Sequence, residues 1–120
     1  MDTSTLDDTR TALVAAVQDC VAAERALNAA NRADLDIERP SEYADLEMRY
    51  SLAADRVREL ADALPTPARS QTDVVLRARV AYALADKDRD GRIATSDDEA
   101  EESTRRLIEA VHDLAGISYS

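Results

Sequence analysis

The stretch Glu42–Leu64, EYADLEMRYSLAADRVRELADAL, has the most regular apolar spacing in the chain. Its apolar residues recur every three or four positions, which is the period of one face of an α-helix. Pro40 with Ser41 marks the start of this helix, and Pro65 with Pro67 marks its end, because proline is tolerated only in the first turn. The residues of this seam are Tyr43, Leu46, Tyr50, Ala53, Val57, Leu60 and Leu64.

A second helical pattern precedes it, from Thr5 to Ala33, and Thr5 with Asp8 resembles a capping box. Its stripe is apolar early and polar at its end. The segment Asp34–Arg39 interrupts the pattern. Two long helices joined by a short turn predict an antiparallel hairpin over residues 5–64. The stripe consists of Leu6, Leu13, Val17, Cys20, Glu24, Leu27 and Asn31.

Downstream of a linker, Pro65–Gln71, a third helix is predicted from Thr72 to Ala85. A fourth helix follows an acidic loop, with Ser96 and Glu99 as its capping box and Gly116 as its C-cap. We therefore predict an all-α fold of four helices. It comprises a long antiparallel helical hairpin and a shorter helix–loop–helix over residues 72–116, within a single domain of residues 1–120. The apolar residues of the fourth helix are Leu107, Ile108, Val111 and Leu114, with Ile117 packing back after it.

Composition supports this class and excludes several functions. The 120 residues include no Phe or Trp and two Gly, and the formal net charge of −10 disfavours nucleic acid or an anionic membrane as partner. No apolar run could span a membrane, and residues 1–11 lack the features of a signal peptide, so we expect a cytoplasmic protein. One Lys beside many Arg, with abundant Ala and Asp, favours a bacterial source.

The segment Asp86–Asp97, DKDRDGRIATSD, has a spacing that packing does not explain. Carboxylates occupy its first, third, fifth and twelfth positions, Gly91 the sixth and Ile93 the eighth. Alternate residues of a tight loop can direct oxygens at one hard divalent cation, while the glycine takes the positive φ of the bend. Asp and Gly are also common in any polar turn between helices, so a solvated loop without metal is the alternative.

This spacing resembles the EF-hand calcium loop. The resemblance implies that Ca²⁺, or the smaller Mg²⁺, is bound with a water at the ninth position, where Ala94 has no ligating atom. The Arg92 side chain would then face water. The implied ligands are the carboxylates of Asp86, Asp88, Asp90 and Asp97 and the backbone carbonyl of Arg92.

The loop departs from the family in four respects. The entering helix offers Ala81, Tyr82 and Ala85 where EF-hands usually place large aromatic residues, which is a partial match. Asp97 replaces the usual Glu, although bacterial dockerin loops, which the segment also resembles, carry Asp there. Acidic residues follow where the family has apolar ones, so the sequence leaves open whether Asp97, Asp98 or Glu99 closes the site. EF-hand loops occur in pairs that join through their eighth residues, whereas this chain has one. We therefore expect Ile93 to pair across a homodimer or to remain unpaired.

No catalytic constellation is evident, and we predict that the protein is not an enzyme. His112 is the single histidine and has no second ligand at zinc-binding spacing, so a structural role is favoured. The lone Cys20 lies on an apolar face and is predicted to be a buried, inert thiol.

Two functions of different classes remain. The first is binding of one divalent cation, calcium above magnesium, in a structural or weak buffering role. The second is a protein-interaction or dimerisation role for the hairpin, with the acidic loop as a capped turn. Thr66–Arg69 followed by Thr72, Asp73 and Arg77, after a helical hairpin, also resembles a group of small alphaproteobacterial helical proteins, and this resemblance implies no activity.

Overall fold

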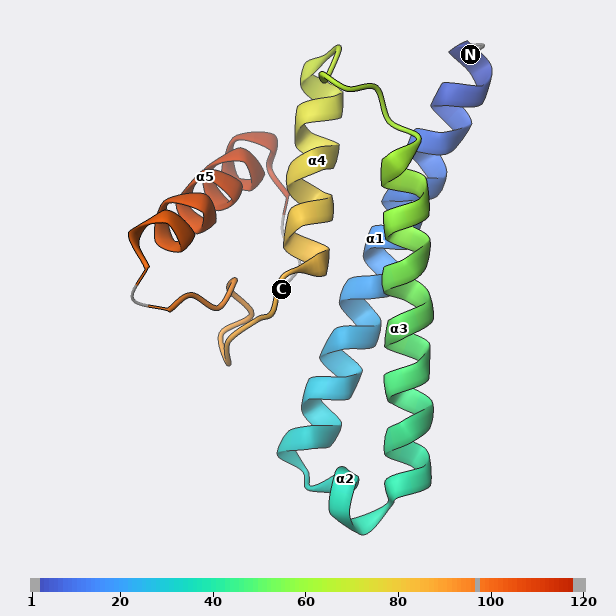
Figure 1. Ribbon diagram of the computed structural model, residues 1–120, viewed down its shortest axis with the longest axis vertical. Coiled ribbons are helices and arrows are strands. Elements are labelled where there is room, and N and C mark those ends of the chain that lie inside the picture. Colours follow the sequence, from blue (N-terminus) through green and yellow to red (C-terminus); the bar gives the residue numbers. More distant parts are fainter. Residues whose placement is uncertain (1–2, 97, 118–120) are drawn as a thin grey trace. The chain divides into compact units, whose positions relative to one another are not determined.

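Helices form every regular element in the computed structural model, which describes residues 3–96 and 98–117 (Figure 1). The fold is all-α, as predicted. Four of the helices correspond to the four predicted ones, and a short helix, α2, occupies the turn that the sequence places between the first two. The helices are α1 (Thr3–Arg32), α2 (Leu35–Glu38), α3 (Pro40–Asp62), α4 (Gln71–Leu84) and α5 (Glu99–Ala115).

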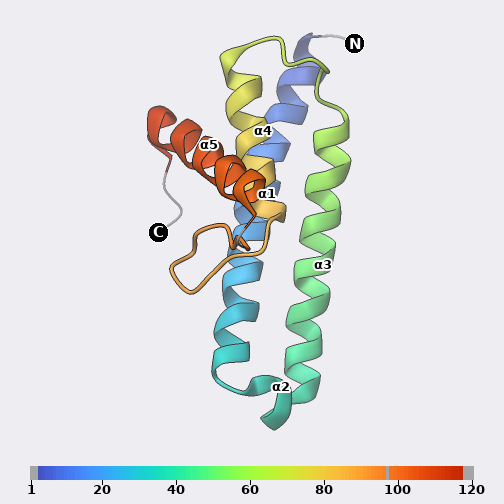
Figure 2. The ribbon, with the colours of Figure 1, turned by 60° about the vertical axis from the view of Figure 1, so that its left-hand side comes forward.

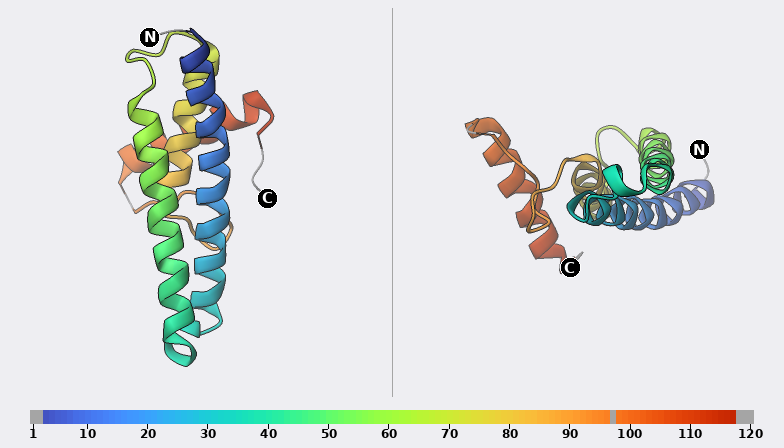
Figure 3. Two further views of the ribbon diagram at one scale, coloured as in Figure 1. Left: turned by 90° about the vertical axis from the view of Figure 1, so that its right-hand side faces the viewer. Right: turned by 90° about the horizontal axis from the view of Figure 1, so that it is seen from below.

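α1 and α3 pack against each other along their length and run in opposite directions (Figures 1 and 3). This is the predicted antiparallel hairpin. Every residue of the predicted seam on α3 is buried or half-buried, and Val57 has no exposed surface. On α1, Leu13, Val17 and Cys20 are also fully buried. The period of the apolar residues therefore gave the correct inward face of both helices.

The polar end of the α1 stripe also has a structural purpose. Asn31 donates a hydrogen bond from Nδ2 to the hydroxyl of Tyr43, over 3.1 Å, and so joins the end of α1 to the start of α3. Between them, Asp34 takes a left-handed conformation with φ of 58°, which Asp tolerates better than most residues, and α2 follows it directly. α3 then begins at Pro40, as predicted.

The second part of the chain is a helix–loop–helix in which α5 crosses α4 (Figure 2). Ser70 caps α4 by accepting a hydrogen bond from the backbone N–H of Asp73 over 3.2 Å. The guanidinium of Arg77 donates to the Pro65 carbonyl and the Thr66 hydroxyl at 3.3 and 3.2 Å, so the linker is anchored to α4. α5 ends at Ala115, and the next residue, Gly116, has a φ of 69° and is its C-cap, as predicted. The Ile117 N–H donates a hydrogen bond to the His112 carbonyl.

Three predicted helix starts were wrong by about two residues. α1 begins at Thr3, so Thr5 lies inside its first turn rather than at its cap. α4 is capped by Ser70 and not Thr72, because Ser70 has the extended backbone that an N-cap requires. α5 is capped by Asp98, whose carboxylate accepts from Ala100 N–H at 2.7 Å, and not by Ser96.

Contacts divide the chain into two compact units, residues 1–64 and 65–120. The boundary falls between Leu64 and Pro65, where the sequence places the end of the hairpin. Among the described residues, no helix has the combined length and apolarity needed to cross a membrane.

Candidate functional site

The acidic loop folds back on itself as a short hairpin between α4 and α5. Lys87 and Ile93 form an isolated antiparallel bridge, Asp88 N–H donates to the Arg92 carbonyl at 2.8 Å, and Ala94 N–H donates to the Asp86 carbonyl at 2.8 Å. Ile93 is therefore not unpaired. Its bridge partner lies in its own loop, because the bend brings the two arms of the loop together. Pairing of Ile93 across a homodimer stays a prediction.

Gly91 forms the bend. Its φ of 77° is the left-handed conformation predicted for the sixth loop position. Its N–H donates to the Asp88 carbonyl at 3.1 Å, and its carbonyl accepts from the Tyr82 hydroxyl at 2.6 Å. The end of α4 therefore holds the tip of the loop through Tyr82, a side chain that is not among the predicted ligands.

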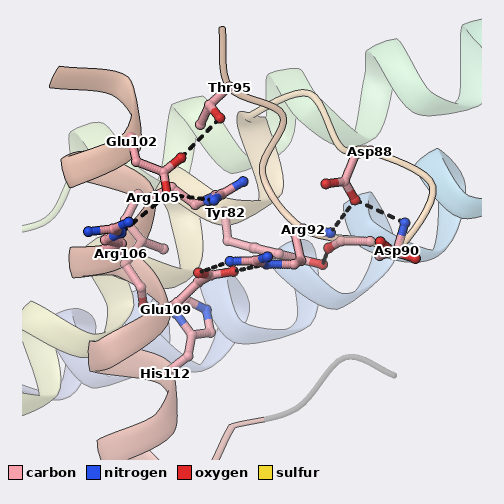
Figure 4. Close-up of polar contacts among 12 residues, drawn as sticks. Tyr82, Asp88, Asp90, Arg92, Thr95, Glu102, Arg105, Arg106, Glu109 and His112 are labelled. Atoms are coloured by element: carbon pink, nitrogen blue, oxygen red, sulfur yellow. Dashed lines mark hydrogen bonds and ion pairs between the residues drawn. The ribbon is translucent and has the colours of Figure 1, made fainter. Parts of the chain in front are cut away.

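Asp88 stabilises the same bend from inside the loop. Its Oδ1 accepts hydrogen bonds from the backbone N–H groups of Asp90 and Arg92, at 2.9 and 3.1 Å (Figure 4). A carboxylate that accepts two backbone hydrogen bonds orders a turn without any ion. Asp88 therefore has a structural role in the turn, in addition to its predicted role as a cation ligand.

Arg92 connects the loop to α5. Its Nε and Nη2 donate to Glu109 Oε2 and Oε1 at 2.9 and 3.0 Å, a two-pronged ion pair between a half-exposed guanidinium and a partly buried carboxylate (Figure 4). The side chain is exposed, as expected, but it also pairs with Glu109. The hydrogen bonds from Arg92 lower the pKa of Glu109, and the same contact raises the pKa of Arg92 above its usual value.

A small aromatic and basic cluster lies behind the loop. The rings of Tyr82 and His112 pack with their centroids 5.5 Å apart, and Lys87 Nζ lies 4.6 Å from the centroid of the Tyr82 ring. The Nδ1 of His112 is 2.7 Å from the Ile108 carbonyl, which can only accept, so this nitrogen carries the proton. His112 is buried, and its contacts are those of a structural residue.

Acidic residues at the start of α5 secure the far end of the loop. Glu101 accepts from both the backbone N–H and the hydroxyl of Ser96, each at 2.8 Å, and these bonds lower its pKa. Glu102 accepts from Thr95 at 3.2 Å and from Arg105 and Arg106. Burial raises the pKa of Glu102, but its hydrogen bonds and basic neighbours outweigh this effect and lower the pKa overall. These residues occupy the place where an EF-hand has apolar side chains.

The predicted ligands that the structure describes do not lie close enough together to coordinate one ion. Asp86, Asp88 and Asp90 have exposed side chains, and Asp97 lies outside the described residues. Within residues 3–96 and 98–117, no group of three or more acidic, His or Cys side chains is close enough to hold a metal ion. The Arg92 carbonyl, a fifth predicted ligand, accepts the hydrogen bond from Asp88.

A shallow hollow of about 360 Å³ opens beside the loop and not at the three aspartates. Its charged lining groups are Glu101 and Arg105 of α5, and the acidic loop contributes residues 93–95 to the same lining. It is therefore distinct from the predicted cation ligands. The complete lining is Ile93, Ala94, Thr95, Ala100, Glu101, Thr104 and Arg105.

Lowering the pH is expected to destabilise this helix–loop–helix. Glu101, Glu102 and Glu109 have pKa values below the ordinary 4.5, so each stabilises the fold above that pH, and the contribution is lost as the pH falls through the lower folded value. Urea midpoints measured from pH 6 to pH 3 should fall mainly below about pH 5. Glu109→Gln should flatten this dependence. Glu47→Gln, an exposed change on α3, should leave it as in the wild type, and equal slopes for the two variants would contradict the assignment.

Neither a protein-family model, a curated protein nor a solved structure matches this chain. Any assignment of function therefore depends on the loop and the helices themselves.

Proposed function

We propose that the protein binds one divalent cation, Ca²⁺ in preference to Mg²⁺, at the acidic loop. The observation that carries this proposal is the coincidence of three alternate aspartates with a bend at Gly91, whose φ of 77° is the backbone conformation such a loop requires. The proposed ligands are the carboxylates of Asp86, Asp88, Asp90 and Asp97 and the carbonyl of Arg92.

The hydrogen bonds already present are compatible with these roles. A carbonyl oxygen has two lone pairs, so the bond that Arg92 accepts from Asp88 leaves one for a cation. Asp88 uses Oδ1 for its two backbone donors, and a carboxylate has a second oxygen. Binding on this proposal would draw the exposed side chains of Asp86 and Asp90 toward the Arg92 carbonyl.

Among the three acids that could close the site, Asp97 fits the spacing best. Asp98 caps α5 through the same carboxylate that would otherwise reach the ion, so recruiting it would uncap the helix at a cost of about 1 kcal/mol. Glu99 is exposed in the first turn of α5. We therefore assign the twelfth ligand position to Asp97. Its side chain is shorter than that of the usual Glu, and this favours weak binding.

The expected role is structural or weakly buffering. Gathering carboxylates that are apart in the structure costs side-chain entropy and charge repulsion, so we expect a Kd of about 10⁻⁴ to 10⁻³ M, the weak end of the range for such loops. Neutralising the crowded charges would hold the α4–loop–α5 segment more firmly. At a hundredfold excess over Kd this amounts to about 2.7 kcal/mol of added stability.

A calorimetric titration of metal-stripped protein tests the proposal. Calcium should give saturable heat at one site per chain, weakened by competing magnesium. The double change of Asp86→Ala and Asp90→Ala should abolish it. The matched control is Asp19→Ala with Asp45→Ala, which removes the same charge from exposed positions on α1 and α3 and should leave binding intact. Absence of heat from the wild type at millimolar calcium, or equal loss in both double variants, would refute the site.

A protein-interaction role for the hairpin is the second candidate. Met48 and Leu52, one turn apart on α3, are 61% and 62% exposed, and this apolar pair favours a partner on the outer face. The seam from Tyr43 to Leu64 does not favour one in the same way, because it is buried or half-buried already.

A further inference from the structure

α5 has apolar residues on two different sides. Ile108 is buried, with His112, on the side that packs on α4. Leu107 and Leu114, two turns apart, are 66% and 92% exposed, and Ala110 between them is also exposed. At about 100° per residue these three lie on one side of the helix, away from Ile108 and His112. The packing of α5 on α4 therefore does not account for this outer stripe of Leu107, Ala110 and Leu114.

We infer that the outer stripe is the contact surface between two copies of this chain, with their α5 helices side by side and antiparallel. This inference does not depend on the proposed cation site. The observation that selects a second copy is the pattern of charge beside the stripe. Arg106 and Asp113 flank the stripe on the same side, seven positions apart and with opposite charges. Charges arranged in this way complement themselves when two identical helices run in opposite directions.

A single two-fold axis brings the charges and the leucines together. With the axis at Ala110, Arg106 of each copy lies beside the partner's Asp113. The same axis places Leu107 beside the partner's Leu114. The midpoints of both pairs fall next to position 110, so one register satisfies both. Alanine at the crossing point also allows the two helices to approach closely.

The two charged groups are placed to take these partners. Arg106 is 75% exposed, and its Nε donates at 3.2 Å to Glu102, which also accepts a hydrogen bond from Arg105. A guanidinium has several N–H groups, so donors remain for a second carboxylate. Asp113 is exposed in the last turn of α5, where the helix dipole disfavours a negative charge. A guanidinium from a second copy would offset that charge.

Other occupants fit the outer stripe less well. The formal net charge of −10 disfavours an anionic membrane surface. An unrelated protein could cover Leu107 and Leu114, but it would not require opposite charges on either side of Ala110. A two-fold contact between identical helices requires that arrangement.

Sedimentation velocity at increasing protein concentration tests the inference. A contact between two helices of 17 residues is smaller than the standard interface of about 1,600 Å². We therefore expect weak dimerisation, with a Kd above about 10⁻⁶ M. With a metal chelator present, the wild type should shift from monomer toward dimer between about 10⁻⁵ and 10⁻³ M. A wild type that stays monomeric over this range overturns the inference, and the chelator makes that outcome independent of the proposed cation site.

Leu114→Gln should weaken dimerisation at least about tenfold, because each dimer loses two apolar contacts. The matched control is Leu52→Gln, the same change at a position on α3 that is 62% exposed, and it should leave the dimer unchanged. If Leu52→Gln weakens the dimer and Leu114→Gln does not, the copies associate through the hairpin and the inference is wrong.

Exchange of the two charges tests the antiparallel arrangement. Arg106→Asp and Asp113→Arg each bring like charges together twice, so each variant should dimerise several-fold more weakly than the wild type. An equal mixture of the two should associate within about threefold of the wild type, because every contact then joins an aspartate to an arginine. The double variant should do the same. Arg58→Asp is the control, since it removes an exposed ion pair on α3 and should leave the dimer unchanged.

Failure of both the mixture and the double variant to recover dimerisation overturns the inference, because the charges then do not meet across a two-fold axis. Circular dichroism of each variant checks that the helices remain folded. If a charge variant does not fold, Leu114→Gln and its control carry the test, since Leu114 is 92% exposed and its replacement removes no internal contact of that size.

Discussion

Val57→Asp should unfold the α1–α3 hairpin. Val57 has no exposed surface and stands in the seam of α3, where an aspartate would bury a charge. Burying a charge in a core costs about 4 to 5 kcal/mol or more, which approaches the whole stability of many small domains. Circular dichroism should show the loss of much of the helical signal at temperatures where the wild type is folded.

Met48→Asp is the matched control, because it makes the same kind of change on the same helix at a position that is 61% exposed. We expect its stability to remain within about 0.5 kcal/mol of the wild type. Equal melting temperatures for the two variants would show that the seam is not a core. The same variant reports on the second candidate function, since a mass unchanged in light scattering would remove self-association of the chain through this face of α3.

Gly91→Val should destabilise the loop by about 1 to 3 kcal/mol. The cause is torsional rather than steric, because a Cβ at this position would meet only the Tyr82 hydroxyl, at 4.0 Å. A β-branched residue cannot adopt the φ of 77° without strain. The Tyr82 hydroxyl should lose its acceptor as the bend opens, which adds to the loss.

Gly91→Asn separates the two causes. Asn enters the left-handed region far more readily than Val, so its cost should be below about 1 kcal/mol although it also adds a side chain. Urea midpoints rank the three proteins, with the wild type highest and Val lowest. Similar losses for Asn and Val would mean that added bulk, and not the backbone conformation, disturbs the loop.

The sequence predicted which helices form more accurately than it predicted where they begin. The three-four spacing around Val57 and Val17 and the position of Pro40 identify the two hairpin helices, because periodicity and proline act locally. Helix starts were less accurate. Ser, Thr and Asp occur close together before α4 and α5, and each could cap, so only the backbone conformation of Ser70 and Asp98 decides. The short helix α2 was not predicted, because four residues are too few to show a helical period of apolar residues.

The bend of the candidate site was predictable from the sequence. The side chains outside the loop that hold it in place were not. Gly91 was identified from the loop spacing alone. Glu109 stands 17 residues from its partner Arg92, and its role depends on how α5 packs on α4, which no local spacing encodes. Tyr82 gave a weak signal, as an aromatic residue near the end of the helix that enters the loop. A glycine between two short arms of similar length is a weak indication of the bridge between Lys87 and Ile93.

The bridge inside the acidic loop has a kinetic consequence. Lys87 and Ile93, and the Tyr82 hydroxyl and Gly91 carbonyl, are separated by fewer than ten residues, and loops of about that length close in roughly 10 to 100 ns. The bend can therefore form before the more distant Arg92–Glu109 contact is made. Folding of this half of the chain should accordingly proceed outward from Gly91, with α5 docking afterwards onto a turn that is already in place.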